Sequence, residues 1–229
     1  MRKKSSRFAM TAILAGMMVT SVASAENRFL TVQLGGLDKG GRVADHMAFC
    51  PPASSKARNI SPEVSWSPGP DGTRSYALLM LDPDVPQDFS QINKPNTVIR
   101  ADAPRISIYH WVLADIPKTI ATLPAGAESE GVVARGKPIG ATAYGLRGAN
   151  VFTTFLAKDE TMAGTYGGYD GPCPPINDER VHHYVFRVFA LDVPSLGLSG
   201  AFDGEAVEKA VRGHVLAQGE VIATYTLKP

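Results

Sequence analysis

The sequence has little excess of either charge. Its 229 residues include 23 Lys and Arg against 22 Asp and Glu. Four of these cations, and no acidic residue, lie in positions 1–25, so the remainder carries 19 cations against 22 anions, a net charge of −3. Nucleic-acid-binding proteins need a basic surface, which this chain lacks. We therefore expect no nucleic-acid partner, and any bound anion must be held locally by a few placed donors.

Signatures of catalysis and of metal binding are also missing. The sequence contains no G-x-S-x-G nucleophile elbow and no H-E-x-x-H pair. A hydrolase with Asp82 and His110 as catalytic residues is therefore the least favoured of the possible functions. Asp82, His110 and His182 are of the types that bind zinc, but no diagnostic spacing supports such a site. We predict that the protein is not an enzyme and needs no metal and no cofactor.

After the first 25 residues, no apolar run approaches the length of a membrane span. Basic residues at positions 2, 3, 4 and 7 precede an apolar run over 8–19, and Ala23-Ser-Ala25 offers small residues for cleavage. This order is typical of a secretory signal peptide, and the run is shorter than the roughly 20 residues of a membrane span. We predict cleavage near Ala25 and a periplasmic or secreted protein without a transmembrane segment. An uncleaved anchor is the alternative.

Only two cysteines occur, Cys50 and Cys173, so one pairing within the chain is possible. Thiols tend to pair in the oxidising compartment that an exported protein enters. The sequence predicts a disulfide between them, and two separate buried thiols are the alternative.

What the chain does contain is a series of strand-like segments in one domain of residues 26–229. Its size suits a single all-β core. The connections are rich in Pro and Gly, as at 67–72 and 166–175. Many strands and few helices favour a sandwich over a parallel α/β sheet. The long apolar strands are expected at 75–81, 106–116 and 184–191, and shorter ones at 29–34, 64–66 and 221–227.

One helix is predicted near the C-terminus. Asp203 can cap it, Glu205 lies in its first turn and Gly219 ends it before a last strand. Its apolar face would hold Ala206, Val207, Ala210, Val211, Val215 and Leu216.

Two segments carry candidate site residues on or beside the long strands. Asp82 opens Asp-Pro-Asp-Val-Pro86, where the chain is expected to leave the core, although a plain turn would look the same. His110 lies within the strand at 106–116. It can equally be a core residue whose ring nitrogens have hydrogen-bond partners and no role in binding. Strand alternation would put His110 on one face with Val112 and Ala114, and on the other face Tyr109, Trp111 and Leu113.

A third candidate segment combines a loop with a strand entry. The Gly/Pro-rich stretch ends at Pro175 and His182-His-Tyr184 follows. Glycine lets backbone N–H groups approach a ligand closely. His182 and Tyr184 would point to one face and His183 to the other, giving a hydrogen-bonding wall. Incidental polar residues at a strand start are the alternative.

Taken together, these motifs resemble the phosphatidylethanolamine-binding protein family. The resemblance spans most of residues 26–229 and keeps the family's order. It rests on Asn59-Ile-Ser-Pro62 with Val64-Ser-Trp66, Asp82-Pro-Asp-Val-Pro86, His110-Trp-Val with Ile116-Pro117, Gly171-Pro-Cys-Pro-Pro175 with His182-His-Tyr184, and His214-Val-Leu-Ala217, expected as helix before a final strand.

The resemblance implies an antiparallel β-sandwich with peripheral helices and a pocket for a phosphate-like anion or phospholipid head group. The implied lining is Asp82, His110, Gly171, Pro172, His182 and Tyr184. His110 would be the main cation and Asp82 its orienting partner, with one positive charge held more readily than two. Family members are also described as inhibitors, so the alternative is a protein-interaction module that inhibits an exported hydrolase or kinase-like partner. Residues 87–108 and 151–165 look longer than in compact relatives and should lie near the pocket mouth.

Overall fold

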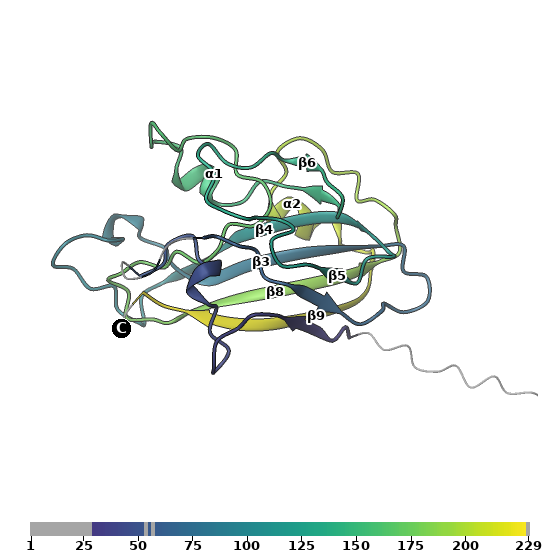
Figure 1. The fold of residues 1–229 in the computed structure, drawn as a ribbon, viewed down its shortest axis with the longest axis horizontal. Coiled ribbons are helices and arrows are strands. Elements are labelled where there is room, and N and C mark those ends of the chain that lie inside the picture. Colours follow the sequence, from purple (N-terminus) through teal and green to yellow (C-terminus); the bar gives the residue numbers. More distant parts are fainter. Residues whose placement is uncertain (1–28, 53–54, 56–57, 228–229) are drawn as a thin grey trace, which may run out of the picture.

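The computed structural model describes residues 29–52, 55 and 58–227, so the predicted signal segment lies outside the described residues. Within these ranges no helix has both the length and the apolar character that crossing a membrane requires. The fold is built from two antiparallel sheets with few helices, which confirms the predicted all-β architecture with peripheral helices (Figure 1).

The larger sheet has six strands in the order β6-β7-β4-β3-β8-β9. Its four long strands run side by side through the middle of Figure 1. The strands of this sheet are β3 (Ser75–Pro86), β4 (Arg105–Pro117), β6 (Gly140–Ala141), β7 (Leu146–Arg147), β8 (His182–Leu191) and β9 (Val215–Tyr225). The smaller sheet, in the order β1-β2-β5, contains β1 (Val32–Leu34), β2 (Val64–Trp66) and β5 (Thr122–Leu123).

Both faces of the large sheet are covered. One face packs against the small sheet through a core that includes Trp66, Trp111 and Phe186. The opposite face packs against α2 (Gly204–Ala210) through Leu79, Val112 and Val207, among others. The remaining short elements are α1 (Phe152–Phe155) and two 3-10 turns, η1 (Asp45–Met47) and η2 (Phe89–Gln91). Burial on both faces explains why the central strands are almost continuously apolar.

The predicted C-terminal helix is correct at its start and wrong at its end. Asp203 Oδ1 accepts a hydrogen bond from Ala206 N at 2.9 Å, as expected of a cap. The helix stops at Ala210, however, and the segment from Val215 through Leu216 to Gly219 belongs to β9. Gly213, at a φ of 84°, turns the chain, and β9 then pairs with β8 along its length. This long-range pairing outweighs the helical periodicity of the local sequence.

A β-bulge changes the predicted faces of β4. Met80 pairs with Trp111 and Leu81 pairs with Tyr109, so His110 is the extra residue. A bulge of this kind reverses the alternation of side chains. Tyr109 therefore packs with Val112 and Ala114, whereas His110 faces the same side of the sheet as Trp111. The expected grouping of His110 with Val112 is wrong for this reason.

Candidate functional site

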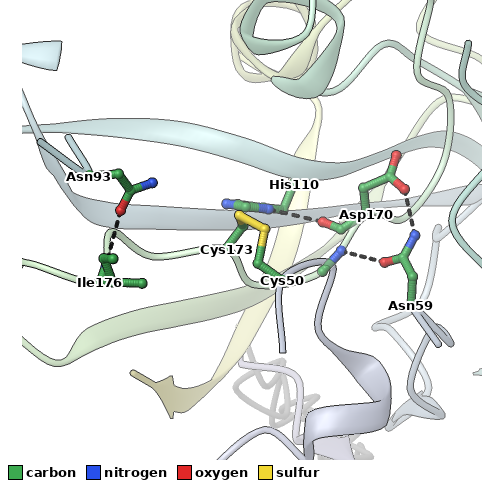
Figure 2. The surroundings of a disulfide bond; sticks show 8 residues. Cys50, Asn59, Asn93, His110, Asp170, Cys173 and Ile176 are labelled. Atoms are coloured by element: carbon green, nitrogen blue, oxygen red, sulfur yellow. Dashed lines mark hydrogen bonds between the residues drawn. A yellow bond between two sulfur atoms is a disulfide. The ribbon is translucent and has the colours of Figure 1, made fainter. Parts of the chain in front are cut away.

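A cavity of about 710 Å³ opens at one end of the large sheet. Asp82, His110 and His182 contribute polar side chains to it from β3, β4 and β8. The Cys50–Cys173 disulfide also lines it, and the structure thus joins the two cysteines as predicted (Figure 2). The other lining residues are Phe49, Val85, Phe89, Ile92, Asn93, Ile108, Phe152, Thr154, Phe155, Leu156, Ala157, Lys158 and Pro175.

Much of the apolar wall comes from the two long segments noted in the sequence. Residues 87–108 supply Phe89 and Ile92, and residues 151–165 supply Phe152 and Phe155, among others. The rings of Phe89 and Phe155 meet edge to face with centroids 5.5 Å apart, and both remain partly exposed. The two segments thus meet at the rim of the cavity, where the sequence predicted them.

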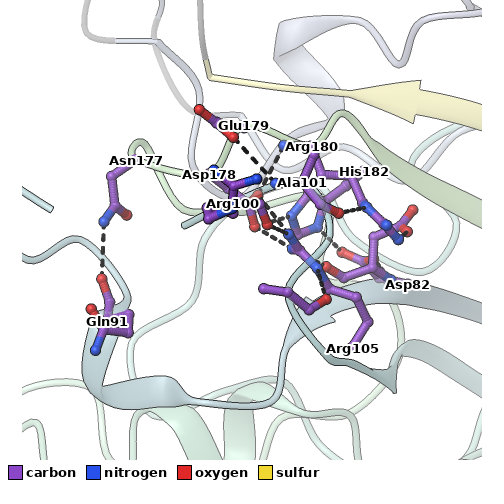
Figure 3. A network of polar contacts seen from close by, with 12 residues as sticks. Asp82, Gln91, Arg100, Ala101, Arg105, Asn177, Asp178, Glu179, Arg180 and His182 are labelled. Atoms are coloured by element: carbon purple, nitrogen blue, oxygen red, sulfur yellow. Dashed lines mark hydrogen bonds and ion pairs between the residues drawn. The ribbon is translucent and has the colours of Figure 1, made fainter. Parts of the chain in front are cut away.

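His182 is held between two carboxylates (Figure 3). Its Nδ1 lies 2.7 Å from Asp82 Oδ2 and its Nε2 lies 3.2 Å from Asp178 Oδ2. Carboxylates only accept hydrogen bonds, so both ring nitrogens donate and the ring is an imidazolium. Burial by itself lowers the pKa of His182, but the hydrogen bonds and charges of Asp82 and Asp178 outweigh it and raise that pKa.

Arg105 completes this buried chain of charges. Its guanidinium donates to both carboxylate oxygens of Asp178, at 2.5 and 3.0 Å, and also to the carbonyl oxygen of Asp84. Burial raises the pKa of Asp178, but the hydrogen bonds of Arg105 and His182 are among the contacts that bring it below its ordinary value. Sequence reasoning missed both residues. The available signals were the position of Asp178 four residues before His182 and an arginine at the start of a buried strand.

His110 is bound quite differently from the sequence-based expectation. Its Nδ1 lies 2.9 Å from the backbone carbonyl oxygen of Asp170, which can only accept, so Nδ1 carries the hydrogen (Figure 2). Burial lowers the pKa of His110, the charge of His182 lowers it further, and the charges of Asp82 and Asp170 only partly oppose this. The prediction that His110 is the main cation with Asp82 as its orienting partner is therefore wrong. The single positive charge lies on His182.

A second buried network fixes the carbonyl that His110 uses. The Asp170 carboxylate accepts from Lys137 Nζ at 2.6 Å, Asn59 Nδ2 at 2.7 Å and Asn150 Nδ2 at 2.8 Å. Asp170 is fully buried, and its backbone N–H donates to the His110 carbonyl at 3.0 Å, which joins this loop to β4. Among the three donors, only Asn59 belongs to a motif that is recognisable in the sequence. Nothing local marks the others, because they come from distant segments.

Three residues of the predicted lining, Tyr184, Gly171 and Pro172, lie outside the cavity wall. Tyr184 is buried behind His110, with ring centroids 5.4 Å apart. In the described part of the chain its hydroxyl has no well-formed hydrogen bond, and burial, reinforced by the charge of Asp82, raises its pKa well above the ordinary value. Gly171 donates its N–H to Asn59 Oδ1, and a Cβ there would lie 2.0 Å from the Met47 carbonyl oxygen.

Pro172 and His183 also have structural contacts that define their positions. The Pro172 carbonyl accepts from the backbone N–H groups of Phe49 and Cys50, so Gly171 and Pro172 hold the loop against the Cys50 segment instead of facing the cavity. His183 turns away, as predicted: its Nδ1 lies 2.8 Å from Asp84 Oδ2 and its side chain is half exposed.

The pH dependence of stability should report the charged state of His182. Because the folded pKa is raised above the unfolded value of about 6.5, His182 contributes stability below that pH and loses it as pH rises through the folded pKa. In urea titrations between pH 6 and 9, the wild type should have a higher free energy of unfolding than His182→Gln. This difference should become smaller as the pH rises. His183→Gln is the control. An advantage that stays constant over this range would contradict a charged His182.

The fold and cavity define an antiparallel β-sandwich with a ligand-sized cavity that has polar groups at one end and apolar walls. The chain belongs to the phosphatidylethanolamine-binding protein family, whose model matches residues 36–226. A UPF0098 protein of Aquifex aeolicus is 32% identical over 172 residues, covering 73% of this chain and 75% of that protein. The UPF0098 protein YbcL of Escherichia coli is 29% identical, covering 74% and 73%.

Solved structures agree on the fold. The crystal structure of Escherichia coli YbcL, described as a new member of the mammalian PEBP family, superposes with a TM-score of 0.62 at 24% identity. It covers 86% of this chain and 98% of that one. A putative PEBP homologue from Chlamydia trachomatis gives a TM-score of 0.58 at 21% identity, covering 87% and 98%. Family membership supports a ligand-binding protein in general.

Proposed function

We propose that this protein is exported and binds a small molecule with a phosphorylated or similarly acidic head group and an apolar remainder. The observation that carries the proposal is the cavity, which combines Asp82 and His110 with walls of aromatic and aliphatic side chains. Its volume of about 710 Å³ falls in the range of sites for organic ligands and is far larger than a phosphate ion requires.

Donors for an acidic group are available around the cavity. Lys158 and Thr154 belong to its lining. Asn93 Oδ1 accepts from Ile176 N at 2.9 Å, so the orientation of the Asn93 amide is set and its NH₂ group is left as a donor (Figure 2). Both cysteines are in the disulfide, so neither offers a thiolate nucleophile beside His110. These features support binding over catalysis.

The expected ligand can be tested with alkyl phosphates. Each buried methylene contributes about 0.8 kcal/mol, so butyl phosphate, with two more methylenes, should bind about 15-fold tighter than ethyl phosphate when the walls cover the chain. His110→Ala should weaken butyl phosphate at least about tenfold, because a hydrogen bond to a charged group contributes about 1.5–3 kcal/mol. Isothermal titration calorimetry measures both effects, with His183→Ala as the control. Equal affinities for the two phosphates would contradict the role of the walls, and unchanged binding by His110→Ala would contradict the site.

A further inference from the structure

A buried lysine amine and a buried side-chain amide meet outside the cavity. The side chain of Lys137 is only 9% exposed, and its Nζ lies 2.6 Å from Asp170 Oδ1. Asn59 is fully buried, and its Nδ2 lies 2.7 Å from the same oxygen. Figure 2 shows the side chains of Asn59 and Asp170 facing each other. One carboxylate oxygen thus holds together an amine and an amide that come from distant parts of the chain.

The Asn59 amide is held at both of its polar atoms. Its Oδ1 accepts from the backbone N–H of Gly171 at 2.9 Å. Its Nδ2 also lies 3.2 Å from the Gly131 carbonyl oxygen and 3.3 Å from Ser129 Oγ. A fixed N–H donor on a carbonyl oxygen stabilises the negative charge that develops there when a nucleophile adds to the carbon. The amide is therefore prepared to be attacked at Cγ.

The Lys137 amine lies beside a base that can take up its proton. Burial lowers the pKa of the Lys137 ammonium more than the charge and the hydrogen bond of Asp170 raise it. Removal from water favours the neutral amine, which is the nucleophilic form, and the adjacent carboxylate can accept the proton that this form gives up. Fixed contact in a folded protein replaces the chance encounter of two dissolved groups and can accelerate their reaction by many orders of magnitude.

We infer that the folded protein joins Lys137 to Asn59 by an isopeptide bond, with Asp170 as the catalytic base. The bond from Lys137 Nζ to Asn59 Cγ forms, and the bond from Asn59 Cγ to Nδ2 breaks. Of the three ammonium protons, one stays on the new amide, one passes to Asp170 and one leaves with Nδ2 as ammonia. The reaction needs no oxidant, reductant or other reactant. Because Asp170 ends protonated, no unpaired charge remains buried.

Asn59 is the electrophile because it shares an oxygen with Lys137. Asn150 also donates to the Asp170 carboxylate, at 2.8 Å, but to Oδ2, the other oxygen. Asp170 itself forms the ion pair with Lys137, and a carboxylate resists attack by an amine. The bond ties the entry to β2, in the small sheet, to the entry to β6, in the large sheet. This cross-link does not depend on the proposed ligand.

The test is mass spectrometry of tryptic peptides from the full-length chain, expressed, purified, unfolded and reduced. Trypsin releases Asn59 in the peptide 59–74 and Lys137 in the peptide 136–147, because the proline after Lys137 prevents cleavage there. We expect one branched peptide that contains both and is lighter by about 17 Da, the mass of ammonia, than the two together. This branched peptide should replace the separate peptides in most of the chains.

Three variants separate the roles of the residues. Lys137→Arg should give only separate peptides, because a guanidinium that stays protonated is not a nucleophile. Asp170→Asn should do the same, because the base is lost. Asn150→Ser is the matched control: it also removes a buried amide from the Asp170 carboxylate, at the other oxygen, and should leave the branched peptide in place.

The wild-type peptides decide the inference even if a variant fails to fold. Recovery of 59–74 and 136–147 only as separate peptides would overturn it. A loss of about 18 Da, the mass of water, with 136–147 joined to 159–180 would place the bond on the Asp170 carboxylate. A link from 136–147 to 148–158 would place it on the second amide. Either of these links would also overturn the inference.

Discussion

Replacing His182 by leucine is expected to destabilise the protein by about 3–5 kcal/mol, because it leaves Asp82 and Asp178 buried without their shared cation. All three side chains are almost completely inaccessible to water. Removing one partner of a buried ion pair exposes the full desolvation cost of the other, and here two carboxylates lose a hydrogen bond each. The midpoint of urea unfolding should fall substantially at an unchanged slope.

His183→Leu is the matched control for this variant. His183 is the adjacent imidazole and also lies beside a carboxylate, Asp84, but its side chain is half exposed. Exposed ion pairs contribute little, about 0–1 kcal/mol. Similar losses for His182→Leu and His183→Leu would show that the buried charge chain is not a major source of stability.

Loss of the disulfide is expected to lower the free energy of unfolding by a similar amount. The bridge joins residues 123 positions apart, and closing so long a loop in the unfolded chain is worth about 4–5 kcal/mol in the chain-entropy model. The folded protein keeps other links between the two segments, since Phe49 and Cys50 both donate backbone N–H groups to the Pro172 carbonyl. Loss of the bridge should therefore act mainly by raising the conformational entropy of the unfolded chain, and the folded protein should retain its cavity.

Urea unfolding of the oxidised protein, with and without reductant, measures this effect. The Cys50→Ser, Cys173→Ser double variant should match the reduced protein and should be insensitive to reductant. Butyl phosphate binding by the double variant then tests whether the cavity survives without the bridge. Coincident unfolding curves for the oxidised and reduced proteins would contradict the prediction.

Three long strands of the large sheet, β3, β4 and β8, could be predicted because they carry their signal locally. Apolar runs at 75–81, 106–116 and 184–191 end at proline or at polar turns, and the observed β3, β4 and β8 include them all. The motifs around Asp82, His110 and His182 likewise pointed to side chains that the structure brings to one cavity. They lie together because β4, β3 and β8 are neighbouring antiparallel strands of the large sheet.

The sequence by itself determined the class of fold, the family, and Asp82, His110 and His182 as cavity residues, because these depend on composition and short patterns. The tertiary structure alone decided three things: that 215–219 is a strand, that His110 lies in a bulge, and that Asp82 pairs with His182. Each depends on contacts between residues distant in the chain, up to 100 positions for Asp82 and His182. Hydrogen bonds of this range assign the charge to His182 and leave His110 neutral, and no local pattern encodes that choice.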